Sequence, residues 1–183
     1  MITIICIGKI KENYFKEAIK DYEKRIGKYH KINIIELMDI NSNDQQVILN
    51  KEKELIMKQL PNRSYIITLE IEGKSINSPQ FAKKIDDLFI RYSNIVFIVG
   101  GSYGLHPDIK KMSNESLSFS ELTFPHQLFR VILLEQIYRC FKINNNETYH
   151  KWCIKLFKIT HYLLGGVFKW KKLFLLLYLY LSF

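Results

Sequence analysis

Hydrophobic residues along the chain form two alternating patterns. Short apolar runs rich in β-branched residues cover positions 2–7, 32–37, 65–70, 95–99 and 117–119, which is typical of buried strands. Between most of them, apolar residues recur at every third and fourth position, as in amphipathic helices. This alternation predicts an α/β fold with a mainly parallel sheet and helices on both faces.

The first three helical segments have clear boundaries. One begins after Glu12 and closes at Gly27, a second covers 46–60, and a third opens at Ser78 and Pro79, since proline suits the first turn of a helix. The charged run 51–54 in the second segment is interpreted as a solvent-exposed face, because alternating charges usually lie in water.

The last helical segment runs from Pro125 to position 143 and is unusually apolar. Its apolar positions are Leu128, Val131, Ile132, Leu134, Ile137, Tyr138 and Phe141. That set is too broad for a helix with one side in water, so the helix either packs in the core on two sides or pairs with another subunit.

Two strand ends open into loops suited to a ligand. The run 95–99 ends abruptly in Gly100 and Gly101, and the run 117–119 leads into the polar loop 120–124 before Pro125. Glycine lets the backbone approach another group closely, and open α/β sheets bind ligands at the carboxyl ends of their strands. We expect the two loops to form one pocket.

Length and charge set outer limits. The chain has 183 residues, of which 48% are hydrophobic, enough for one sizeable core and too few for two ordinary domains. Of the net charge of +9, the last 32 residues contribute five lysines and no acid, which leaves +4 for positions 1–151. That excess is compatible with RNA binding and equally with an ordinary soluble enzyme.

The three cysteines, Cys6, Cys140 and Cys153, show no paired spacing. Neither a metal site nor a disulfide framework is therefore expected, and free thiols fit the reducing cytoplasm. The N-terminus lacks the features of a signal peptide, and the apolar C-terminal run is too short for a transmembrane segment. We expect a cytoplasmic protein.

Several motifs follow one another in a characteristic order. They are Thr68-Leu69-Glu70 with Gly73-Lys74, the loop 100–105, the segments 117–120 and 123–127, Arg130, the segment 135–139, and Tyr149-His150-Lys151. Together they resemble the RlmH family, the small SPOUT-class methyltransferases that act on N3 of a pseudouridine in helix 69 of bacterial 23S ribosomal RNA. The resemblance covers residues 1–151 as a single domain.

The resemblance implies a trefoil knot in the C-terminal half, a homodimer with the site at the subunit boundary, and 23S RNA within the ribosome as partner. It also implies S-adenosylmethionine as the cofactor and no metal. By matching positions, the methyl donor contacts Leu69, Gly100, Phe119, Ser120, Glu121, Leu122, Thr123 and Phe124.

The imide N3 of a pseudouridine carries a proton and is poorly nucleophilic, so a base or a stabilising cation is needed beside the ring. The candidates are His126, Arg130, Tyr149, His150 and Arg139. His126 is either that base or a helix cap packed on its loop. The two arginines are better suited to RNA phosphate or the partner subunit than to proton transfer.

Residues 152–183 depart from the family, whose members end near Tyr-His-Lys. This basic and apolar extension is a membrane-surface element, a cover for part of the dimer, or sequence without a selected role, and the last interpretation is favoured. Two other functions compete with the main one. They are a non-catalytic dimer that binds RNA or the ribosome, and a SPOUT methyltransferase acting on another RNA.

Overall fold

The computed structural model describes residues 1–149. Within them, five strands form a parallel sheet in the order β2-β1-β4-β3-β5. The strands are β1 (Ile2–Ile7), β2 (Ile32–Leu37), β3 (Ser64–Ser75), β4 (Asn94–Val99) and β5 (Glu115–Ser118). The helices are α1 (Asn13–Ile26), α2 (Gln45–Gln59), α3 (Ser78–Arg91), α4 (Pro107–Met112) and α5 (His126–Asn144).

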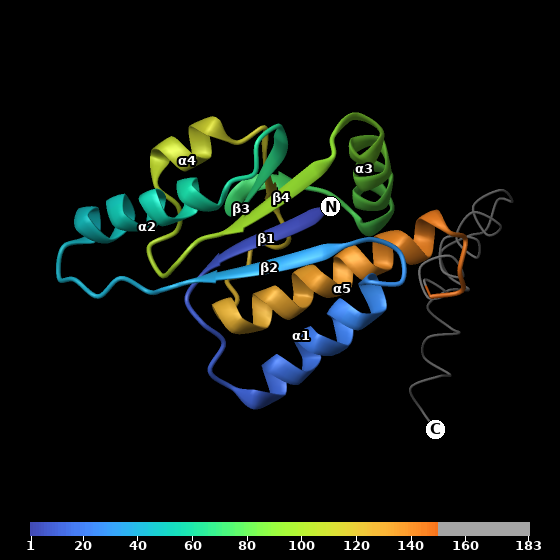
Figure 1. The fold of residues 1–183 in the computed structure, drawn as a ribbon, viewed down its shortest axis with the longest axis horizontal. Coiled ribbons are helices and arrows are strands. Elements are labelled where there is room, and N and C mark those ends of the chain that lie inside the picture. The colour runs from blue at the N-terminus through green and yellow to red at the C-terminus, as the bar shows by residue number, and fades with distance from the viewer. Residues whose placement is uncertain (150–183) are drawn as a thin grey trace, which may run out of the picture. The chain divides into compact units, whose positions relative to one another are not determined.

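Helices cover both faces of the sheet (Figure 1), which confirms the predicted fold class. On one face, Ile56 of α2 and Ile109 of α4 join a buried cluster with Ile7 of β1 and Ile98 of β4. On the other face, α5 packs against both α1 and α3, and Phe97 of β4 contacts Phe81 of α3. Neighbouring positions of β4 thus serve opposite faces, as strand geometry requires.

Side-chain caps fix where two of the helices begin. The carboxylate of Asp44 accepts a hydrogen bond from the backbone of Gln46 at 2.8 Å at the start of α2. Asn77 and Gln80 form a reciprocal capping box before α3, which satisfies backbone donors that would otherwise lack partners. These caps explain why the predicted helix starts are close to the observed ones.

Strand β3 is longer than the predicted run 65–70. Its pairing with β5 shifts register between Leu69 and Lys74, both of which lie opposite Leu117. Gly73 lies at this irregularity, and a Cβ there would be 2.5 Å from the backbone carbon of Leu117. A hydrophobic run could not reveal this extension, because polar residues 70–75 continue the strand. The trefoil knot stays a prediction.

Helix α5 packs in the core on two sides, which is the first of the two environments predicted for it. Leu133, Leu134 and Ile137 are fully buried between its neighbours, and Phe141 stacks on Tyr29 after the end of α1 with ring centroids 5.5 Å apart. Two-sided packing accounts for the breadth of its apolar set. Pairing of α5 with a second subunit stays a prediction.

The interpretation of the charged run 51–54 as an exposed face is wrong at Glu52. Lys51 and Glu54 are exposed, but Glu52 is only 6% exposed. Ile48 lies one turn before it and Ile56 one turn after it on the same helix, and both are buried. Glu52 therefore occupies the stripe of α2 that faces the sheet.

Candidate functional site

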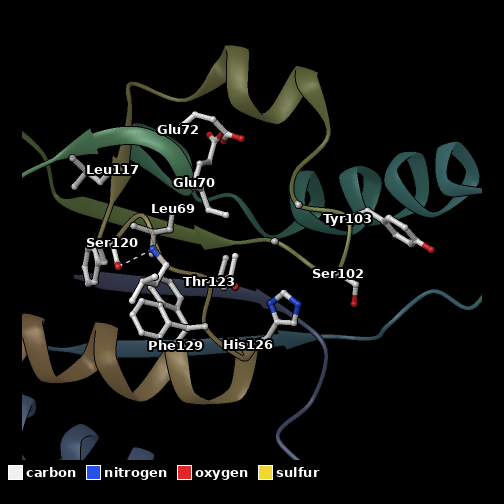
Figure 2. Close-up of a pocket in the computed structure, with 18 of the residues that line it drawn as sticks. Leu69, Glu70, Glu72, Ser102, Tyr103, Leu117, Ser120, Thr123, His126 and Phe129 are labelled. Atoms are coloured by element: carbon white, nitrogen blue, oxygen red, sulfur yellow. Dashed lines mark hydrogen bonds between the residues drawn. The ribbon is translucent and has the colours of Figure 1, made fainter.

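A pocket of about 420 Å³ opens at the carboxyl ends of β3, β4 and β5. Figure 2 shows side chains from three segments converging on it: the end of β3 around Leu69, the loop after β4, and the loop between β5 and α5. The two loops predicted to meet do form one pocket. Its position matches the general place for ligands in open α/β sheets.

The glycine loop after β4 makes one wall and is tightly closed. The backbone N–H of Gly104 donates to the carbonyl oxygen of Gly101 at 3.0 Å, and Gly104 has a positive φ of 77°. A Cβ on Gly100 would lie 2.6 Å from the carbonyl oxygen of Gly104. The loop can therefore close in this way only with glycine at position 100.

The loop between β5 and α5 makes an apolar wall held by two serines. Ser118 donates to the carbonyl oxygen of Ser120 at 3.0 Å, and the Ser120 hydroxyl accepts from the backbone of Leu122 at 2.9 Å. Phe119 and Phe124 both contact the ring of Phe129, with centroids 5.5 and 6.1 Å away. Aromatic walls of this kind suit a flat heterocycle.

Leu122 lies at the mouth of the pocket and is 73% exposed. Tyr103, on the opposite loop, is also largely exposed. Exposed apolar side chains beside a pocket favour contact with a ligand or a second macromolecule.

One ionised carboxylate lies in the pocket wall. The Glu70 carboxylate receives the Lys110 ammonium at 2.6 Å and the Ser116 hydroxyl at 2.9 Å. Burial alone would raise the pKa of Glu70, but hydrogen bonds from Lys110, Thr68 and Ser116 outweigh burial and lower this pKa below its usual value. Glu70 therefore brings a negative charge to the pocket at neutral pH.

His126 lies at the pocket, as Figure 2 shows, and its side chain is exposed. Pro125, and not His126, occupies the cap position of α5, and the role of His126 as a base stays a prediction. The neighbouring Gln127 accepts hydrogen bonds from the backbone of Lys11 and Glu12 at 2.9 and 3.4 Å. This contact ties the start of α5 to the segment after β1.

Arg130 lies elsewhere and is only 3% exposed. Its guanidinium donates to the carbonyl oxygens of Ile7 and Gly8 at 2.6 and 2.7 Å, and to the Glu36 carboxylate at 2.9 Å. A group this buried has no surface to offer to RNA phosphate, so that expectation is corrected. Arg130 instead ties α5 to the carboxyl ends of β1 and β2.

The pocket gathers seven of the eight residues expected to contact the donor, all except Glu121. Glu70, Lys110 and Phe129 also line it and were missed. Phe129 lies within the predicted helix, but nothing in its spacing separates a pocket residue from a core residue. Lys110 lies on α4, a six-residue helix that the hydrophobic pattern does not predict.

Three further candidates are not among the described residues that line the pocket. Tyr149 follows the compact unit Met1–Asn146 and belongs to the next one. His150 lies outside the described residues. Arg139 pairs with Glu135 one turn earlier on α5.

No cluster of three or more His, Cys, Asp or Glu side chains suited to a metal ion occurs within residues 1–149. No helix among these residues is long and apolar enough to span a membrane.

Comparisons with known proteins agree with this geometry. The family described as "Predicted SPOUT methyltransferase" matches residues 1–150. A "Ribosomal RNA large subunit methyltransferase H" of Clostridium botulinum (strain Alaska E43 / Type E3) is 50% identical over 157 residues, covering 82% of this chain and 99% of the relative. A protein of the same name from C. botulinum strain Eklund 17B is 48% identical over the same shares.

A solved structure, "a probable methylase family protein from Haemophilus influenzae Rd KW20", has the same fold. The TM-score is 0.50 at 15% identity, with 98% of this chain and 86% of that chain covered. The fold and the matched family define a methyltransferase of the SPOUT class. Within that class, the chain belongs to the RlmH family, the ribosomal RNA large subunit methyltransferases H.

Proposed function

We propose that this chain transfers a methyl group from S-adenosylmethionine to N3 of a pseudouridine in helix 69 of 23S ribosomal RNA. The observation that carries the proposal is the single pocket in which seven residues expected to hold the donor meet. The relatives named as large-subunit ribosomal RNA methyltransferases support the choice of RNA. The catalytic domain is residues 1–151, and the site of action is the assembled ribosome in the cytoplasm.

The pocket fits the chemistry of this donor. Its volume of about 420 Å³ lies within the range of roughly 300–1,000 Å³ common for small-molecule sites. Leu69 and Phe124 would hold the adenine, and the glycine loop offers backbone groups at close range. The Glu70 carboxylate, which is paired with Lys110, would lie close to the sulfonium and share its charge between the two cations.

S-adenosylmethionine, when bound, supplies an electrophilic methyl group on its sulfonium. The residues of this chain must orient the two reactants and take the proton from N3. His126 is exposed and lines the pocket, so its imidazole is the proton acceptor in this proposal. Tyr149 and His150 stay candidates for contact with the base.

RNA recognition in this proposal depends on large surfaces. Residues 1–151 carry a net charge of only +4, which is a modest electrostatic contribution to RNA affinity. A homodimer would double that surface, and the assembled ribosome would supply shape that naked RNA lacks.

Two assays test this function against its alternatives. Calorimetry should detect binding of S-adenosylmethionine, whereas a non-catalytic RNA-binding dimer would give none. Labelled methyl groups should then pass to ribosomes lacking the modification and not to transfer RNA. Transfer to another RNA alone would favour a SPOUT methyltransferase with a different substrate.

A further inference from the structure

Glu52 of α2 lies directly behind the glycine loop. Its two carboxylate oxygens are 3.0 and 3.2 Å from the position that a Cβ on Gly101 would take. Gly101 lines the pocket, whereas Glu52 does not. The carboxyl group therefore touches the loop from outside the pocket, at a residue whose missing side chain leaves room for it.

Glu52 is only 6% exposed as a residue, and its carboxyl group forms no hydrogen bond or ion pair among residues 1–149. Burial and, to a smaller extent, the nearby Asp39 carboxylate together raise the pKa of Glu52 to about 7. An unpaired charge in such a place is costly, so the uncharged form is favoured.

The other charged groups around Glu52 offer it no compensation. The segment after β2 brings Asp39, whose oxygen lies 2.8 Å from the position of a Cβ on Gly8. On the same face as α2, α4 brings Asp108, whose carboxylate is bound by Lys53 of α2 at 3.1 Å. The glycine loop contributes the titratable Tyr103, which is largely exposed.

We propose that Glu52 is a positioning residue for the methyl donor, whose uncharged carboxyl group packs against Gly101 and holds the loop 100–104 in its donor-binding shape. This role rests on the proposed function, because it presumes that the donor occupies the pocket. When Glu52 ionises, the repulsion from Asp39 and the demand for water draw its carboxylate away from the loop. The loop then loses its support and the donor binds more weakly.

The sign of the pH dependence follows from the raised pKa of Glu52. The ordinary pKa of this carboxyl is 4.5, and in the folded chain it is about 7, so the group stays neutral below pH 7 and ionises as the pH rises through that value. Donor affinity should therefore fall across this window. By reciprocity, donor binding favours the protonated form and takes up protons near neutral pH.

Titration calorimetry with S-adenosylmethionine tests the proposal on the full chain. From about pH 6 to about pH 8.5, wild-type affinity should fall about tenfold, equivalent to a shift of one pKa unit on binding. Glu52→Gln keeps the shape but cannot ionise, so its affinity for S-adenosylmethionine should stay nearly constant over this pH range. The matched control is Glu54→Gln, an exposed change on the same helix, which should follow the wild type.

The pH profiles of the wild type and of Glu52→Gln decide whether Glu52 has this role. Identical pH profiles for wild type and Glu52→Gln overturn the role of Glu52 and leave the proposed function standing, whereas an absence of binding in both at every pH overturns both. A second variant, Asp39→Asn, removes the charge that helps to raise the pKa of Glu52. It should move the midpoint of the wild-type profile to lower pH, and an unmoved midpoint counts against the proposal even if Glu52→Gln does not fold.

Discussion

At the residue scale, Gly100 is a position of the pocket that has no room for a side chain. A Cβ there would lie 2.6 Å from the carbonyl oxygen of Gly104 and 3.1 Å from the Leu105 side chain. Gly100→Val should therefore open the loop and weaken binding of S-adenosylmethionine by at least about a hundredfold, a loss of roughly 3 kcal/mol. Titration calorimetry measures it.

The matched control for Gly100→Val is Ser102→Ala in the same loop. Ser102 is exposed and removal of its hydroxyl adds no atom, so affinity should stay close to that of the wild type. Unchanged affinity in Gly100→Val itself would remove the glycine loop from the donor site.

Pocket residues could be predicted from the sequence where an apolar run marks the end of a strand. Gly100 and Phe124 could be assigned because they follow apolar runs and match a known family. Glu52 and Lys110 could not be assigned in this way. A glutamate among lysines predicts exposure, and its burial depends on which stripe of α2 faces the sheet; Lys110 reaches Glu70 only through the fold.

At the element scale, α5 is fixed to the sheet by Arg130. Its guanidinium bonds to the ends of β1 and to Glu36 of β2 from a buried position. Arg130→Ala leaves the carbonyls of Ile7 and Gly8 without these donors and Glu36 without its cation. The free energy of unfolding should drop by about 3 kcal/mol, measured by denaturant titration.

Arg25→Ala is the control for that change. Arg25 forms an ion pair with Asp21 one turn earlier on α1, but both side chains are about half exposed. Its loss should therefore lower the free energy of unfolding far less than the loss of Arg130. Equal costs for the two variants would contradict the role given to Arg130.

Element prediction succeeded where the hydrophobic pattern was clear. The runs 2–7 and 32–37 match β1 and β2, and Gly27 follows the end of α1. It failed at α4, where a helix of six residues with one buried position, Ile109, carries no periodic signal. It also failed at the end of β3, because residues 70–75 pair with β5 through a register shift.

At the scale of the whole molecule, the sheet and all the helices described here are complete by Asn144. A chain truncated after Lys151 should therefore fold, bind S-adenosylmethionine and stay in solution at least as well as the full chain. It should also be a homodimer by light scattering, since α5 retains the partly exposed Leu128 beside its buried stripe. Residues 152–183 themselves lie outside the described part of the chain.

If the truncated chain unfolds or no longer binds the donor, residues 152–183 are required for folding or for donor binding. A monomer that still binds the donor would instead contradict the homodimer alone. The two results can be told apart because calorimetry measures donor binding and light scattering measures the oligomeric state of the same sample.

The identity of the methylated nucleotide tests the central claim most directly. Mass spectrometry of 23S RNA fragments would be compared between a strain lacking this gene and the same strain with the gene restored. The account predicts a methyl group on the pseudouridine-containing fragment of helix 69 in the restored strain and none in the other, with Gly100→Val failing to restore it. An unmodified helix 69 fragment in the restored strain, or an equally methylated one in the strain lacking the gene, would contradict the account.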